Sequence, residues 1–139
     1  MTRRGTAAGG LIAIALLALA GCGAASTGSS ASASNAEDLL RASSGVCHAI
    51  TQLPGDVPGS VRAFQDEAHD VLHALAAIPS LNRGMAAQVL VTMSQVESDI
   101  ASGPTAQSLR DHLDELLLAT DSALKALGQT PPDCPATEG

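Results

Sequence analysis

The sequence predicts an all-α protein, a four-helix up-down bundle that follows a signal peptide and a flexible linker. Two observations predict the bundle. First, apolar residues recur at spacings of three and four from Asn35 to Leu127, which is the period of an α-helix, and no stretch alternates as a strand would. Second, turn-forming residues near 53–59, 79–80 and 102–104 divide this region into four segments. Helices joined by such short connections pack antiparallel.

The composition allows one small domain and argues against a nucleic-acid partner. The chain has 139 residues, of which 45% are hydrophobic, and a formal net charge of −7 at pH 7. Phe64 is the only Phe, Trp or Tyr, whereas proteins that bind single-stranded nucleic acids stack bases on aromatic side chains. An acidic chain also lacks the clustered Lys and Arg that neutralise phosphates. We therefore expect no nucleic acid to bind.

The N-terminus has the pattern of a secretory signal peptide. Arg3 and Arg4 give it a positive start, and residues 11–20 form an uninterrupted apolar run. A helix of that length covers about 15 Å, half of the roughly 30 Å of a bilayer core, so the run is too short to span a membrane. The arginine pair leaves twin-arginine export open, but general secretion is favoured because the residues after the pair are not apolar.

The apolar run ends in Leu19-Ala20-Gly21-Cys22, which resembles the lipobox of bacterial lipoprotein precursors at all four positions. The resemblance implies cleavage between Gly21 and Cys22, a diacylglyceryl group on the Cys22 sulfur, and acylation of the new N-terminus with a fatty acid such as palmitate. Two or three acyl chains hold a protein firmly on a membrane without spanning it. We therefore expect residues 1–21 to be removed and the protein to be lipid-anchored on the extracytoplasmic face of the cell membrane. An ordinary secretory signal followed by a coincidental cysteine is the alternative.

Residues 22–34 are expected to form the lipidated cysteine and a flexible linker, because those after Cys22 are only Gly, Ala, Ser and Thr. The helical bundle is predicted to occupy residues 35–128. Asn35 can cap the first helix, and the Ser-Ser-Gly at 43–45 weakens its middle. The inward stripe of this helix is predicted to contain Leu39, Val46, Cys47 and Ile50, with Leu40 at its edge.

The other three helices are predicted over residues 58–78, 81–102 and 104–127. Ser80 or Asn82 can cap the third helix, and Gly128 can end the fourth. The inward stripes of these helices are predicted to contain Val61, Phe64, Ala68, Val71, Leu72, Leu75 and Ile78; then Met85, Val89, Met93, Val96 and Ile100; and finally Leu109, Leu113, Leu116, Leu117, Thr120, Leu124 and Leu127.

The cysteine count agrees with export. If Cys22 carries lipid, Cys47 and Cys134 remain, and an oxidising compartment favours a disulfide between them. This bond would tie the Pro-rich tail, residues 129–139, across the first helix. Two free thiols or a metal-binding pair are the alternatives, although no Cys-x-x-Cys or Cys/His spacing supports a metal.

The candidate metal ligands are His69, His73, Asp66 and Asp70 on the predicted second helix. The two histidines are four residues apart and share a helical face, so they could chelate a divalent metal to which the carboxylates add oxygen ligands. On a regular helix, however, His69 and His73 lie about 120° and 160° from the centre of the apolar stripe. We therefore expect this face to be solvated and predict no resident cofactor, with a metal site as the alternative. His112 could supply a third nitrogen if the second and fourth helices are neighbours.

The sequence shows no catalytic pattern, so we expect a protein that is not an enzyme. It contains no Gly-x-Ser-x-Gly motif and no phosphate-binding glycine loop, and its adjacent carboxylates diverge around their helices. Val91 and Leu118 fall on the outer faces of their helices and would seed a partner-binding patch if they lie close together. The expected function is non-catalytic, either binding of another envelope protein or support of envelope organisation. The alternatives are a metal- or haem-binding protein that uses His69 and His73, and a carrier of an apolar ligand.

Overall fold

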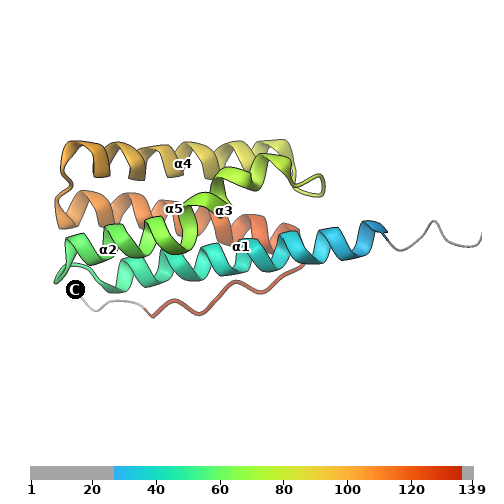
Figure 1. The fold of residues 1–139 in the computed structure, drawn as a ribbon, viewed down its shortest axis with the longest axis horizontal. Helices are drawn as coiled ribbons and strands as arrows, with labels where there is room; N and C mark the ends of the chain where they lie inside the picture. The colour runs from blue at the N-terminus through green and yellow to red at the C-terminus, as the bar shows by residue number, and fades with distance from the viewer. Residues whose placement is uncertain (1–26, 136–139) are drawn as a thin grey trace, which may run out of the picture.

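The computed structural model describes residues 27–135 and shows an all-α bundle, which confirms the predicted fold class (Figure 1). Four helical rods run antiparallel in succession, and each lies against two of the others around one core. The second rod is a continuous run of helical turns of three kinds. The elements are α1 (Thr27–Thr51); α2 (Val57–Phe64), the π turn η1 (Gln65–His69), α3 (Asp70–His73) and the 3-10 turn η2 (Ala74–Ala77), which together form the second rod; α4 (Arg83–Ser102); and α5 (Ala106–Ala126).

Polar side chains and glycines set the helix ends. Asp56 at the start of α2, Asn82 at α4 and Thr105 at α5 each accept a hydrogen bond from a backbone N–H two or three residues further on, at 2.7–3.0 Å. Asn82 is one of the two caps predicted for the third helix. Gly103 and Gly128 follow α4 and α5 with φ angles of 83° and 75°, the left-handed region that favours glycine. The predicted role of Gly128 as a helix terminator is confirmed.

The first helix starts earlier than the sequence predicts. α1 begins at Thr27, so residues 27–34, which the composition assigns to a flexible linker, are helical. Once the packed part of a helix has formed, each further residue adds a backbone hydrogen bond without a new nucleation cost, and alanine favours this extension most. The predicted signal peptide, Cys22 and the linker residues before Thr27 lie outside the described residues.

The core of the bundle consists of the predicted stripes. Every residue that the helical period places inward is buried or partly buried, and all four rods contribute to one apolar cluster. Thr120, a polar member of the α5 stripe, donates a hydrogen bond to the carbonyl of Leu117 at 2.9 Å and so remains satisfied when buried. Val91 and Leu118 are 60% and 69% exposed, which confirms their predicted outward positions.

The Ser-Ser-Gly stretch in the middle of α1 is a packing site, and the predicted weakness is offset by tertiary contacts. Ser43 is fully buried, and its hydroxyl donates to Oδ1 of Asp121 on α5 at 3.1 Å. Gly45 meets η1 so closely that an added Cβ would lie 2.7 Å from the Cβ and 2.9 Å from the carbonyl carbon of Glu67. A residue without a side chain therefore lets the second rod approach α1 to this distance.

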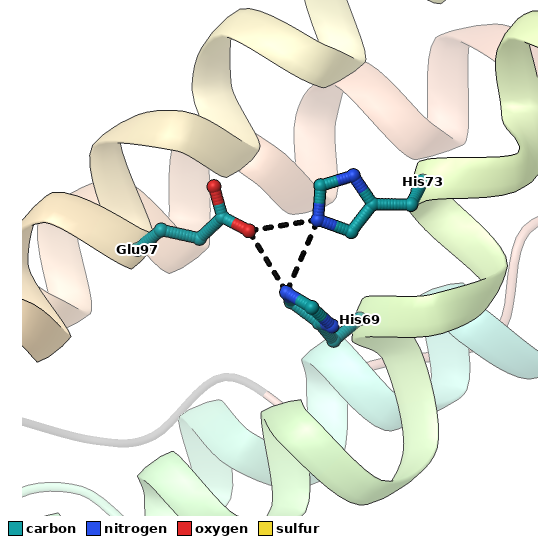
Figure 2. Close-up of side chains that lie close together, drawn as sticks. All are labelled: His69, His73 and Glu97. Carbon is teal, nitrogen blue, oxygen red and sulfur yellow. Dashed lines mark hydrogen bonds and ion pairs between the residues drawn. The ribbon is translucent and has the colours of Figure 1, made fainter.

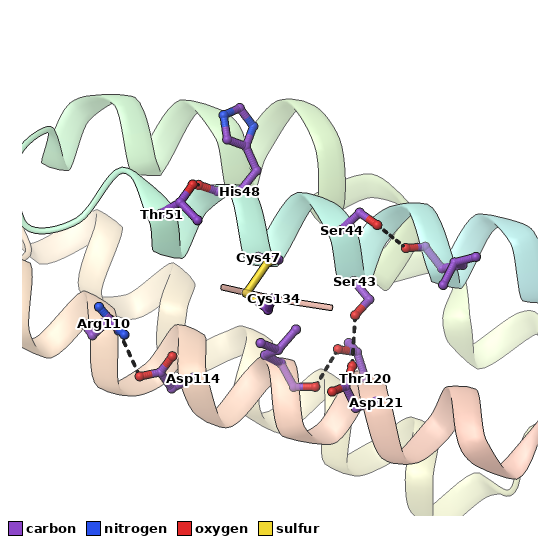
Figure 3. Close-up of a disulfide and its surroundings, with 12 residues drawn as sticks. Ser43, Ser44, Cys47, His48, Thr51, Arg110, Asp114, Thr120, Asp121 and Cys134 are labelled. Carbon is purple, nitrogen blue, oxygen red and sulfur yellow. Dashed lines mark hydrogen bonds and ion pairs between the residues drawn. A yellow bond between two sulfur atoms is a disulfide. The ribbon is translucent and has the colours of Figure 1, made fainter. Parts of the chain in front are cut away.

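Cys47 and Cys134 form a disulfide, which confirms the predicted pairing (Figure 3). Their Cα atoms lie 5.6 Å apart although the residues are separated by 87 positions in the sequence. Cys47 is buried on α1, and the segment that follows α5 runs back along α1 to bring Cys134 to it (Figure 1). The bond therefore holds the irregular C-terminal segment against the first helix.

We expect Gly45→Ala to lower the free energy of unfolding by about 1–3 kcal/mol, because the added methyl group would overlap Glu67 and push the second rod away from α1. The loss should appear although alanine is the better helix former by about 1 kcal/mol. Urea denaturation followed by circular dichroism measures it. Gly55→Ala is the control, since a Cβ there would meet nothing closer than 3.9 Å. Equal stability of Gly45→Ala and the wild type would contradict the close contact.

Replacing both cysteines, by Cys47→Ser with Cys134→Ser, should lower the free energy of unfolding by about 2–5 kcal/mol, since the disulfide restricts the unfolded chain over a long loop. Urea denaturation of the oxidised wild type and the double variant gives the difference. A reducing agent should lower the stability of the wild type by the same amount and leave the double variant unchanged. If the reducing agent destabilises both proteins equally, the loss does not come from this bond.

Candidate metal centre

Two histidines of the second rod and a glutamate of α4 direct their donor atoms to one spot (Figure 2). Oε1 of Glu97 lies 2.8 Å from Nε2 of His69 and 2.9 Å from Nε2 of His73, and the two nitrogens are 3.2 Å apart. The side chains of His69, His73 and Glu97 are 31%, 50% and 34% exposed. These three residues are called the His–His–Glu cluster below.

The π turn helps to direct both imidazoles toward α4. η1 ends at His69, and because a π turn holds more residues than an α turn, the side chains after it are rotated from their positions in a regular helix. Ala68 is buried in the core, and the buried ring of Phe64 meets the His69 ring edge-on, with centroids 5.9 Å apart. The histidine face is only partly solvated, because Glu97 of α4 reaches both rings.

Hydrogen bonds can link each imidazole to Glu97 but leave the contact between the two imidazoles unused. If both Nε2 atoms carry a proton, both N–H groups donate to the same Glu97 oxygen, and the two nitrogens lie 3.2 Å apart without a bond between them. A cation bound to all three lone pairs would engage every donor atom of the cluster at once.

Asp70 holds His69 from outside the cluster. Its Oδ1 lies 3.1 Å from Nδ1 of His69. A proton on Nδ1 that is donated to Asp70 leaves the Nε2 lone pair free, which is how carboxylates orient metal-bound histidines. The structure thus brings the two predicted histidines together but places neither predicted aspartate among the converging ligands. Asp70 reaches the far side of the ring because it directly follows His69, and Asp66 is exposed beside a groove that also contains Arg41.

The donor set fits a tetrahedral divalent metal. Zinc–ligand bonds of about 2.0–2.1 Å in tetrahedral geometry put neighbouring ligand atoms about 3.3–3.4 Å apart. The three donor atoms here are 2.8–3.2 Å apart, so partly exposed side chains need to separate by roughly 0.5 Å or less to admit the ion. Imidazole ligands suit zinc, whereas magnesium and calcium prefer oxygen. Three protein ligands leave the fourth position of a tetrahedral metal open.

The other two histidines have carboxylate partners of their own. Nδ1 of His112 on α5 lies 2.7 Å from Oδ2 of Asp99 on α4, and Nδ1 of His48 on α1 lies 2.8 Å from Oε1 of Glu67. The structure does not bring His112 to the cluster as the third nitrogen that the sequence suggested. The reason is topological, because the second rod packs against α1 and α4.

Glu97 is the site residue that the sequence analysis missed. A signal for it is present, because Glu97 directly follows the inward-facing Val96 and so lies at the edge of the stripe of α4. Consecutive helices of an up-down bundle are neighbours. A carboxylate at that edge can therefore face a histidine pair on the preceding helix.

Comparisons with family models, with curated proteins and with solved structures found no match to the chain. None of the helices between Thr27 and Pro135 combines the length and the apolar character needed to cross a lipid bilayer.

Proposed function

We propose that this protein is a lipid-anchored metal-binding protein of the extracytoplasmic membrane face, and that its His–His–Glu cluster binds a zinc ion. The observation that supports a metal site is the convergence of three donor atoms from two rods, namely Nε2 of His69, Nε2 of His73 and Oε1 of Glu97. A cation would engage all three lone pairs at once. Asp70 supports this proposal because its carboxylate favours the His69 tautomer that a metal needs.

Zinc is proposed on the basis of the ligand types. The donor atoms are 2.8–3.2 Å apart, between the roughly 2.8–3.0 Å of neighbouring ligands in a tetragonal site and the roughly 3.3–3.4 Å of a tetrahedral one, so their spacing alone does not select the metal. Two imidazoles and one carboxylate are a set that zinc uses where it has three protein ligands. The ligand side chains are 31–50% exposed, so bulk water reaches the ion. A structural zinc site has four protein ligands, whereas this cluster supplies three, which favours exchange of the ion. The proposed role is therefore reversible binding and release.

The lipid anchor is proposed from the sequence, since its residues lie outside those that the structure describes. Residues 19–22 resemble a lipobox, and a disulfide such as Cys47–Cys134 is typical of an oxidising compartment outside the cytoplasm. Cleavage before Cys22 would leave five basic side chains against fourteen acidic ones. Anionic lipid surfaces repel so acidic a domain, so acyl chains would have to hold it at the membrane. The proposed partner is another envelope protein that delivers or accepts the ion.

Titration of the mature protein in detergent micelles with Zn²⁺, or with Co²⁺ as a coloured substitute, should show one bound ion per chain. His69→Ala, His73→Ala and Glu97→Gln should each abolish stoichiometric binding at micromolar metal, because each removes one of three ligands. Asp70→Asn should weaken binding by up to about tenfold, the low end for a partner that orients a ligand, because the Asp70 carboxylate is almost fully exposed. The Co²⁺ spectrum and isothermal calorimetry measure both effects.

His48→Ala and His112→Ala are the matched controls for this titration, because each removes a histidine that is paired with a carboxylate outside the cluster. Both variants should bind the ion as the wild type does. Stoichiometric binding that survives the combined loss of His69, His73 and Glu97 would place the metal elsewhere and refute the site. Stoichiometric binding of Cu²⁺ without stoichiometric binding of Zn²⁺ would refute the choice of ion.

Cys22→Ser should abolish lipidation, because the resemblance to a lipobox makes the Cys22 sulfur the acceptor of the acyl anchor. We expect the wild type to incorporate labelled palmitate and to sediment with membranes, and Cys22→Ser to do neither. Cys47→Ser with Cys134→Ser is the control and should keep the label, since those two cysteines form the disulfide. Recovery of the wild-type precursor in the cytosol, uncleaved and unlabelled, would contradict the anchor.

A further inference from the structure

A small pocket adjoins the His–His–Glu cluster between the second rod and α4. Its volume is about 210 Å³, and two of its walls are the proposed metal ligands His69 and Glu97. The remaining walls come from one turn of each rod, namely Phe64, Gln65, Ile100 and Ala101. A molecule in this pocket would lie directly beside the bound ion.

The ion in this cluster would have a free coordination position and an unbalanced charge. Three protein ligands occupy three of the four positions that zinc prefers. The two imidazoles are neutral when they bind a metal, so Glu97 alone offsets the double positive charge and the site keeps one positive charge. The ligand that best completes it is therefore a monoanion.

The pocket walls indicate what else that ligand carries. The phenyl ring of Phe64 is fully buried behind the pocket, and Ile100 and Ala101 line it with aliphatic groups, so the body of the ligand is apolar. The amide of Gln65 can donate a hydrogen bond to the second oxygen of a carboxylate, for which a thiolate has no counterpart. The volume lies below the roughly 300–1,000 Å³ of sites for drug-sized ligands, so the apolar body is short.

We infer that the metal-loaded protein binds a short-chain monocarboxylate, whose carboxylate completes the zinc coordination and accepts a hydrogen bond from Gln65 while its alkyl chain enters the pocket beside Phe64, Ile100 and Ala101. This inference rests on the proposed metal function. The protein would then carry its ion as a mixed complex with a small organic anion, and removal of the anion would open the position through which the ion is passed on.

The test uses the mature protein in detergent micelles, loaded with Co²⁺, and titrates it with acetate, propanoate and butanoate while the visible Co²⁺ spectrum is recorded. Each acid should shift the spectrum. Each added methylene should tighten binding by up to about fourfold, the value for full burial of one CH₂, so that butanoate binds about 4–15-fold more tightly than acetate. Equal affinities for acetate and butanoate, measured on protein that does bind Co²⁺, would overturn this inference and leave the metal function standing.

Two variants test the contacts of the carboxylate and those of the alkyl chain separately. Ala101→Leu fills the pocket from an exposed position on α4, so it should retain Co²⁺ and acetate binding but lose the preference for butanoate. Ala87→Leu, the same change at another exposed position on α4, should keep that preference. Gln65→Leu should weaken all three acids by the same factor. A chain-length preference that persists in Ala101→Leu would overturn the pocket, whereas failure of the wild type to bind Co²⁺ would overturn the metal function and this inference together.

Discussion

The close approach of the second rod to α1 at Gly45 is the constraint on which the position of the site depends. With no side chain at Gly45, the backbone of Glu67 lies against α1, and the π turn that contains Glu67 is seated there. The next residue, Ala68, is buried in the core, and His69 follows at the end of the turn on the side of α4. A larger residue at position 45 would move the whole turn outward, because interiors this closely packed transmit displacement along a rigid helix. The contact at Gly45, on the side of the second rod that faces α1, therefore determines where the cluster lies on the side that faces α4.

All four histidines of the chain lie within hydrogen-bonding distance of a carboxylate, but only in the cluster do two histidines share one. His48 with Glu67 and His112 with Asp99 are one-to-one pairs, in which Nδ1 of one ring meets a single carboxylate oxygen. At the cluster, two imidazoles share one carboxylate oxygen and also approach each other. Three donor atoms that meet at one point are what a bound cation requires. We therefore propose the metal at this histidine pair and regard the other two pairs as links between helices.

Periodicity predicted the parts of the fold that burial determines, and missed the parts that depend on a particular contact between helices. The stripes from Leu39 to Leu127 repeat as a regular helix requires, so the core and the outward positions of Val91 and Leu118 follow from spacing alone. The start of α1 at Thr27 does not follow, because helix extension beyond the packed region depends on small propensities that no apolar pattern marks. The π turn and the meeting of Glu97 with the histidines depend on contacts between helices. A regular helix of 100° per residue places Asp66 and Asp70 nearest to the histidines and by itself gives no sign of Glu97.

The residues that hold the fold together are different from those that are proposed to bind the ion. The apolar core and the Cys47–Cys134 disulfide involve all four rods and the C-terminal segment, whereas the ligands come only from the second rod and α4. Loss of the ion would therefore remove one contact between two rods and leave the bundle folded, which a protein that takes up and releases its cargo requires.

The mature domain would also carry nine more acidic than basic side chains. The resulting negative potential attracts cations to its surface. The same potential repels the domain from anionic lipids, so a covalent anchor on a short connection would keep it beside a surface that it otherwise avoids. Acidity and lipidation would then serve one purpose, because anionic headgroups gather the same divalent ions that the cluster binds.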